Sequence, residues 1–245
     1  MKRRLALVAA ALAAPLLLAA CQQGPSAAQR AATARAEADA QRAAEAQREY
    51  ALYQQMLARK DTELAADLGT QIVQRYPGTA AASAVEKNLP ALVAQAKALR
   101  ERRRLRALWD YQTGVPMAGG VQNTASIYDT TPGGTQGSIQ LILRRQSAWG
   151  QSVYLYGQAP GFVCKGLCQV PIRVDGGQPQ DWAAYLPPTG EPALFIKNDV
   201  RFIAMLEKAH SIEMTVRLKD AGTRNLRYQV GGFQPGDFPP LSRKH

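Results

Sequence analysis

Histidine is almost absent from the chain, which has only His210 and His245 among its 245 residues. A serine or cysteine nucleophile usually needs a histidine as its base. His245 is the last residue, and His210 ends a short predicted helix, where a cation suits the helix dipole. The sequence also has no Gly-x-Ser-x-Gly motif. These absences argue against a hydrolase of the serine or cysteine type.

Ligands for metals and nucleotides are equally scarce. No two side chains of the metal-binding types stand at ligand spacing with a third in support. The three glycine pairs mark turns and belong to no phosphate-binding motif; they are Gly133-Gly134, Gly176-Gly177 and Gly231-Gly232. We therefore expect no metal, no cofactor and no enzymatic activity. One enzymatic hypothesis stays open, a cell-wall glycan hydrolase that uses two carboxylates from the region of Asp175, Asp181, Glu191 and Asp199.

The chain also lacks an apolar run long enough for a comfortable membrane span. Its first apolar run, Leu5 to Leu17, follows a basic N-terminus and is broken by Pro15. The residues Leu18-Ala19-Ala20-Cys21 close this run and resemble a lipobox, in which the cysteine thiol is acylated and becomes the mature N-terminus. The resemblance implies a bacterial lipoprotein with a signal peptide over residues 1–20 and a lipid on Cys21.

Only two further cysteines exist, Cys164 and Cys168. In an oxidising periplasm two thiols this close in sequence are expected to form a disulfide, and Gly166 between them supplies backbone freedom for the turn. The alternative is redox chemistry or metal binding, which a lone pair of this spacing supports only weakly. We therefore expect a structural disulfide.

Helical signals dominate the first half of the chain. Residues 21–46 are rich in alanine and lack large apolar side chains, which predicts a tether that is helical in part. Residues 47–112 follow the helical period, with Asp61 and Thr79 as N-caps and Pro90 at a kink or restart. The turn Gln74-Arg-Tyr-Pro-Gly-Thr79 resembles helix-turn-helix repeats of the tetratricopeptide type, although the likeness covers about one repeat.

Beyond a glycine-rich linker at 113–120, the apolar period drops from 3.6 to 2. Alternating runs such as Ile139/Leu141/Leu143 predict seven or eight short strands over 121–234, with a hairpin at Asp175-Gly176. One short helix, capped by Asp199, interrupts them, and residues 235–245 read as a tail. The sequence therefore predicts an α+β protein of two domains, a helical hairpin with a long helix followed by an antiparallel β-sandwich with one short helix.

The second half also resembles a family of periplasmic modules related to invasion-associated locus B and to accessory components of type VI secretion. The likeness rests on Cys164…Cys168-Gln-Val-Pro-Ile-Arg-Val-Asp-Gly-Gly, Ala193-Leu-Phe-Ile196, Asp199-Val-Arg-Phe-Ile-Ala-Met-Leu206, Ala221-Gly-Thr-Arg and Tyr228-Gln-Val230. It implies a β-sandwich with one helix and carries no catalytic set.

Positive charge is in excess, with a formal net charge of +11. One group, here called the basic cluster, stands out locally; it consists of Lys97, Arg100, Arg102, Arg103, Arg104 and Arg106. It can be a solvated helix end whose cations suit the helix dipole, or a contact for lipid phosphates, glycan carboxylates or an acidic partner. Nucleic acid is not expected, because no aromatic residues are interleaved with the basic ones.

Together these features predict a lipoprotein anchored on the periplasmic face of the outer membrane by the lipid on Cys21. Gln22 favours the outer membrane, since it is not the aspartate that resembles an inner-membrane retention signal. The expected role is a non-enzymatic interaction or scaffold module for an envelope protein. The alternative is a binder of anionic envelope polymer, peptidoglycan or lipopolysaccharide, through the basic cluster.

Overall fold

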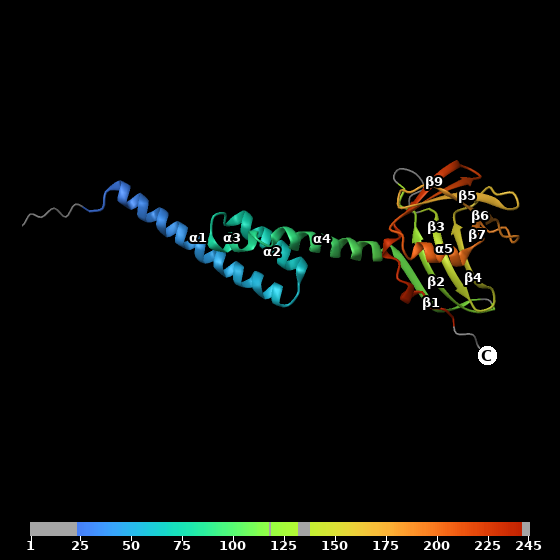
Figure 1. Cartoon of the computed structure of the whole chain (residues 1–245), viewed down its shortest axis with the longest axis horizontal. Coiled ribbons are helices and arrows are strands. Elements are labelled where there is room, and N and C mark those ends of the chain that lie inside the picture. Colours follow the sequence, from blue (N-terminus) through green and yellow to red (C-terminus); the bar gives the residue numbers. More distant parts are fainter. Residues whose placement is uncertain (1–23, 118, 132–137, 242–245) are drawn as a thin grey trace, which may run out of the picture. The chain divides into compact units, whose positions relative to one another are not determined.

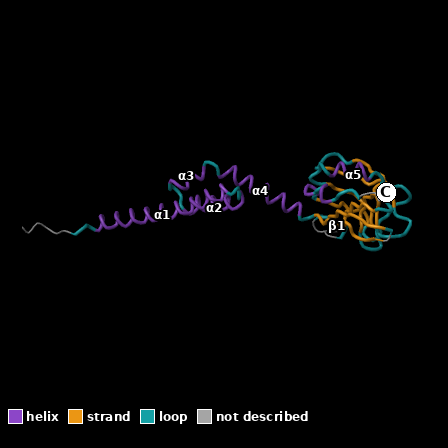
Figure 2. The backbone as a smooth tube through the Cα atoms, turned by 90° about the horizontal axis from the view of Figure 1, so that it is seen from below, coloured by secondary structure: helices purple, strands orange, loops and turns teal. Residues whose placement is uncertain are grey.

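The computed structural model describes residues 24–117, 119–131 and 138–241, which fall into two compact units, Met1–Pro90 and Ala91–His245 (Figure 1). Helices make up the described part of the first unit, and all of the strands belong to the second (Figure 2). The expected signal peptide and the expected lipid site at Cys21 lie outside the described residues. Within the described ranges, no helix is both long enough and apolar enough to cross a membrane.

Helix α1 (Ala27–Ala58) joins the expected tether and the first expected helix into one element. A capping box closes its N-terminus: the Gln29 N–H donates to the Ser26 hydroxyl, and the Ser26 N–H donates to the Gln29 side chain. Residues 27–45 are exposed, because their only apolar side chains are those of alanine, and Ala46 is the first buried residue. The Ala-rich segment is therefore a continuous helix without an apolar stripe.

Helices α2 (Thr62–Arg75) and α3 (Ala80–Glu86) pack against α1 and bury Tyr53, Ile72 and Val85. Asp61 caps α2 and Thr79 caps α3, as the sequence predicts.

A carboxylate in α1 also fixes the end of α2. Glu49 accepts hydrogen bonds from the Tyr76 hydroxyl at 2.8 Å and from the Arg75 guanidinium at 3.0 Å. The helices α1, α2 and α3 are thus held together by a small apolar core and by these two polar contacts of Glu49.

Helix α4 (Leu89–Arg106) begins one residue before Pro90, a position in the first turn where a proline needs no hydrogen-bond donor. The structure differs from expectation just beyond it. Residues 109–112, expected as helix, and 113–117, expected as linker, form strand β1 (Trp109–Met117), and Gly120 of the expected linker begins β2 (Gly120–Tyr128). Gly114 and Pro116 are tolerated because β1 is an edge strand whose register shifts between Gln112 and Val115.

The remaining elements are β3 (Gln140–Gln146), β4 (Gly150–Tyr156), β5 (Cys168–Val174), β6 (Gln180–Tyr185), β7 (Ala193–Ile196), α5 (Asp199–Leu206), β8 (Ile212–Leu218) and β9 (Gly222–Tyr228). The strands form one antiparallel sheet in the order β1-β2-β3-β4-β7-β6-β5-β8-β9. This confirms the α+β fold class, with the strands joined in one continuous sheet. The sheet curls back on itself, since the Thr130 N–H after β2 donates to the Arg227 carbonyl in β9 at 2.7 Å.

One apolar core fills the inside of the curled sheet. It takes alternate residues from the strands, for example Leu141 and Leu143 from β3 and Val153 and Leu155 from β4. Helix α5 closes the core with Phe202, whose ring meets that of Trp182 edge-on at 5.6 Å. Its N-cap is Asn198, one residue before the expected Asp199.

The C-terminal segment is not the tail that the sequence suggests. After the short 3₁₀ helices η1 (Val230–Gly232) and η2 (Pro235–Asp237), the Phe238 ring is buried in the core. The Asn123 amide donates to the Pro239 carbonyl, and Arg145 donates to the Phe238 carbonyl at 2.6 Å. The described residues 235–241 therefore belong to the second unit, here called the β domain, because one aromatic side chain and two backbone carbonyls are held there.

The end of α4 lies directly on η1. A Cβ atom at Gly232 would stand 2.2 Å from the backbone carbonyl carbon of Leu105, so only glycine permits this approach. Two arginines reinforce it: Arg106 pairs with Asp237 at 2.9 Å, and Arg104 donates to the Gln229 side chain. The β domain thus includes the last turn of the long helix.

We predict that G232A lowers the free energy of unfolding of the β domain by about 1–3 kcal/mol, because the added methyl group must displace backbone atoms of α4. The matched control is G236A, since a Cβ at Gly236 meets nothing within 4 Å. Urea unfolding followed by near-UV circular dichroism measures both variants. Equal stabilities of the two would contradict the close packing of α4 on η1.

Candidate binding surface

The structure places all six residues of the basic cluster on α4 with exposed side chains. Arg104 bonds to Glu101 at 2.7 Å as well as to Gln229, and Arg106 pairs with Asp237. The hydrogen bond from Arg104 lowers the pKa of the Glu101 carboxyl and raises that of the guanidinium. At least these two arginines therefore hold α4 on the β domain.

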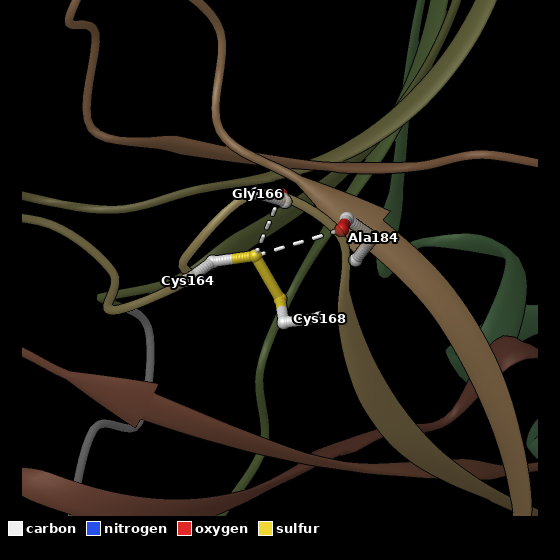
Figure 3. Close-up of a disulfide and its surroundings, with 4 residues drawn as sticks. All are labelled: Cys164, Gly166, Cys168 and Ala184. Atoms are coloured by element: carbon white, nitrogen blue, oxygen red, sulfur yellow. Dashed lines mark hydrogen bonds between the residues drawn. A yellow bond between two sulfur atoms is a disulfide. The ribbon is translucent and has the colours of Figure 1, made fainter.

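Cys164 and Cys168 form a disulfide, as the sequence predicts, with an S–S distance of 2.05 Å and a Cα–Cα distance of 5.5 Å (Figure 3). The Cys164 sulfur lies 3.5 Å from the carbonyl oxygen of Ala184 in β6 and 3.7 Å from that of Gly166. The bridge joins the loop before β5 to the start of that strand and brings it against β6. This placement suits the expected structural role.

The four carboxylates of the hydrolase hypothesis occupy different elements. Asp175 lies in the β5–β6 turn, where it accepts hydrogen bonds from the backbone N–H groups of His210 and Ser211. Asp199 begins α5 and accepts from Gln151 at 3.0 Å, Asp181 is exposed on β6, and Glu191 precedes β7. In the described part of the chain, no three histidine, cysteine, aspartate or glutamate side chains are grouped to hold a metal ion.

An unexpected feature is the outer face of the sheet, which is rich in aromatic side chains. Alternation along β4 turns Val153 and Leu155 inward and Tyr154 and Tyr156 outward. Other strands of the sheet add Tyr128 from β2, Phe195 from β7 and Tyr185 from β6 to this face. The solvent-exposed face of an antiparallel sheet is commonly polar. This concentration of aromatic side chains on the outer face is therefore not explained by packing of the core.

Part of this face forms a continuous stack of flat groups, here called the aromatic stack. Tyr154, Phe195 and Tyr185 are cross-strand neighbours, and their rings lie nearly parallel with centroids 4.7 Å and 5.5 Å apart. Arg144 lies over the ring of Tyr154 at 5.2 Å, and over that of Trp149 at 5.3 Å. The stack therefore runs from the β3–β4 turn across β4 and β7 to β6.

Trp149 ends the stack, and its backbone and its ring each have a partner although the residue is 58% exposed. The turn that carries it is fixed by the buried Gln146 side chain, which accepts from the backbone N–H groups of Ala148 and Trp149, the latter at 2.7 Å. Arg144 in turn donates to the Ser152 hydroxyl at 3.2 Å. An exposed indole that is positioned from two sides has already lost much of the freedom that binding would remove.

Beside the stack lies a hollow of about 320 Å3, here called the aromatic groove. Strands β4 and β7 and Trp149 of the β3–β4 turn contribute most of its apolar lining, and Arg144 of β3 and the β6–β7 loop add charged and polar groups. The residues that line it are Arg144, Trp149, Tyr154, Tyr156, Pro187, Thr189, Glu191, Ala193 and Phe195. A groove with mostly apolar walls and a few polar groups is the usual form of a ligand site.

Neighbouring groups shift the pKa of two side chains in the groove, those of Glu191 and Tyr154. A hydrogen bond from Thr189 lowers the pKa of the Glu191 carboxyl, and the Arg144 cation acts in the same direction. Burial raises the pKa of the Tyr154 phenol, which the nearby arginine partly opposes. These shifts favour the ionised carboxylate of Glu191 and the neutral phenol of Tyr154.

Sequence reasoning missed this surface although a signal was present. The alternating pattern predicts the inward residues of each strand, and an antiparallel sheet is expected to have polar residues between them. Tyr154 and Tyr156 stand at the outward positions of β4, so the same alternation assigns aromatic residues to the outer face. The partners Phe195 and Tyr185 became visible only with the strand order β4-β7-β6.

We predict that R144Q makes Trp149 more accessible to acrylamide quenching and costs about 0.5–1 kcal/mol of stability, because the indole loses the cation packed on its ring. The other two tryptophans, Trp109 and Trp182, are buried, so quenching reports on Trp149. The control is R173Q, which removes an exposed arginine from β5. Identical quenching of the two variants would show that Arg144 does not hold the indole.

No protein-family model matches the chain, and no curated protein matches it in sequence. Among solved structures it is similar to the crystal structure of invasion-associated protein B from Bartonella henselae, with a TM-score of 0.33 and 18% sequence identity. The likeness covers 51% of this chain, in its C-terminal half, and 86% of the other chain. At this distance the function has to be argued from the site itself.

Proposed function

We propose that this chain is a non-enzymatic interaction module of the bacterial cell envelope, which binds its partner through the aromatic groove on the β domain. The observation that carries the proposal is Trp149, an exposed indole fixed by Arg144 and Gln146 at the edge of a hollow. Rigid, exposed aromatic side chains are the groups that most often dominate binding energy at protein surfaces.

The place of action rests on the lipobox-like residues Leu18-Ala19-Ala20-Cys21. A lipid on Cys21 would tether the chain to the periplasmic face of the outer membrane, and α1 would follow a few residues later. The exposed residues 27–45 of α1 span roughly 30 Å at about 1.5 Å per residue. A helix that buries nothing over this length serves as a spacer between a lipid surface and a folded body.

The basic cluster supports its own hypothesis less well. Arg104 and Arg106 are engaged with Gln229 and Asp237, so their substitution would loosen the β domain whether or not they meet a polymer. The groove offers a surface that the packing of the domain does not require. We therefore place the interaction there.

The interaction is tested by photocrosslinking in cells that make the full chain. We predict that benzoylphenylalanine in place of Tyr156, inside the groove, gives a discrete adduct with an envelope component. The same group in place of Leu167, an exposed apolar residue outside the groove, should give severalfold less. Adding W149A should abolish the adduct from the Tyr156 position. Equal yields at both positions, or an adduct that ignores Trp149, would refute the groove as the binding surface.

The anchor is tested separately by fractionation and lipid labelling. We predict that C21S no longer incorporates palmitate and leaves the membrane fraction. We expect Q22D to keep the lipid but to move the protein toward the inner membrane, because the new aspartate resembles a retention signal. Membrane association of C21S at the parent level would exclude lipidation as the anchor.

A further inference from the structure

We infer that the ligand of the aromatic groove is a glycan of low net charge, with one pyranose ring stacked on Trp149. This inference rests on the proposed function, because it names the class of molecule that the groove would take. It follows from three properties of the groove: its ring surfaces, its balance of charge and its position in the sheet.

The ring surfaces come first. Within the aromatic stack, Tyr154 packs against Phe195 and Arg144, and Phe195 packs against Tyr154 and Tyr185, so these ring faces already have partners. Trp149 is different, since it ends the stack, has Arg144 over its ring and is still 58% exposed. A flat indole that is accessible and packed against an arginine on its ring suits the C–H face of a sugar ring, whose hydrogens carry partial positive charge and meet the negative face of the π-system.

The polar groups of the groove fit a molecule that both donates and accepts hydrogen bonds. Arg144 supplies donors, Glu191 supplies acceptors, and the Tyr156 hydroxyl can do either. The Thr189 hydroxyl donates its proton to Glu191 and can accept from a ligand. One cation and one carboxylate leave the lining without net charge. A strongly anionic or cationic ligand would meet one like charge for each opposite one, whereas sugar hydroxyls can use both.

The position of the groove argues against an extended peptide. Peptides often bind by adding a strand to a free sheet edge, which pairs their backbone with the protein backbone. The groove lies over β4 and β7, and each of these strands is paired on both sides, β4 with β3 and β7, and β7 with β4 and β6. A ligand over these two strands therefore finds no free strand edge and meets their side chains, as a polyhydroxylated chain can.

The walls of the groove are built before any ligand arrives. In the β6–β7 loop, Thr189 donates to the Glu191 carboxylate, the Gly190 N–H donates to the Pro187 carbonyl, and the Pro192 carbonyl accepts from Gly157 at 3.0 Å. The hollow of about 320 Å3 is near the lower end of the range for small-molecule sites, which suits a short segment of a chain.

The test measures binding to the purified full chain in mild detergent by isothermal titration calorimetry. The probes are a β-1,4-linked N-acetylglucosamine tetramer, maltotetraose and a proline decapeptide, and the two glycans differ in linkage and substituents. We expect at least one glycan to bind. W149A should weaken that binding about tenfold or more, W149F should retain most of it, and Y156A should weaken it independently.

The control is V200A, which removes an exposed apolar side chain outside the groove and should leave the affinity unchanged. An unfolding midpoint of W149A equal to that of the parent chain ties its loss to the site. Failure of both glycans while the Trp149-dependent crosslink persists would overturn the glycan inference and leave the interaction module standing. Trp149-dependent binding of the decapeptide alone would overturn it as well. Loss of both the glycan signal and the crosslink would overturn the inference and the proposed function together.

Discussion

The pairing register of β4 with β3 and β7 is the constraint on which both the core and the candidate site depend. It turns Val153 and Leu155 into the core and, by the same alternation, aligns Tyr154 with Phe195 on the outer face. A slip of one residue would bury the tyrosines and expose the aliphatic side chains. The apolar core therefore fixes the geometry of the aromatic stack, although the two surfaces share no side chain.

Arginine does two different kinds of work in this molecule. On α4, Arg104 and Arg106 use their hydrogen-bonding capacity on Gln229 and Asp237 and so attach a helix end to the β domain. On β3, the flat guanidinium of Arg144 packs against two aromatic rings, those of Tyr154 and Trp149. The first group belongs to the densest run of charge in the sequence, while the single arginine packed between rings is the better candidate for ligand contact.

The elements that the sequence predicted are those with local causes. The caps Asp61 and Thr79, the hairpin at Asp175-Gly176 and the Cys164–Cys168 pair each depend on a few adjacent residues. The misses have distant causes. Strand β1 contains Gly114 and Pro116 and exists because β2 pairs with it, and Phe238 is part of the domain because Arg145 and Asn123 reach it across the fold. The aromatic groove was missed for the same reason, since strands far apart in sequence bring its rings together.

The way Gln146 supports the β3–β4 turn bears on how this surface can diversify. The buried amide grips two backbone N–H groups, those of Ala148 and Trp149, and is indifferent to the side chains that those residues carry. Position 148 is exposed at the tip of the turn, and position 149 forms the end of the stack. Relatives of this chain could therefore exchange the residues at the tip and acquire new selectivity without altering the sheet beneath. Such a turn would also be a natural place to graft a foreign recognition element.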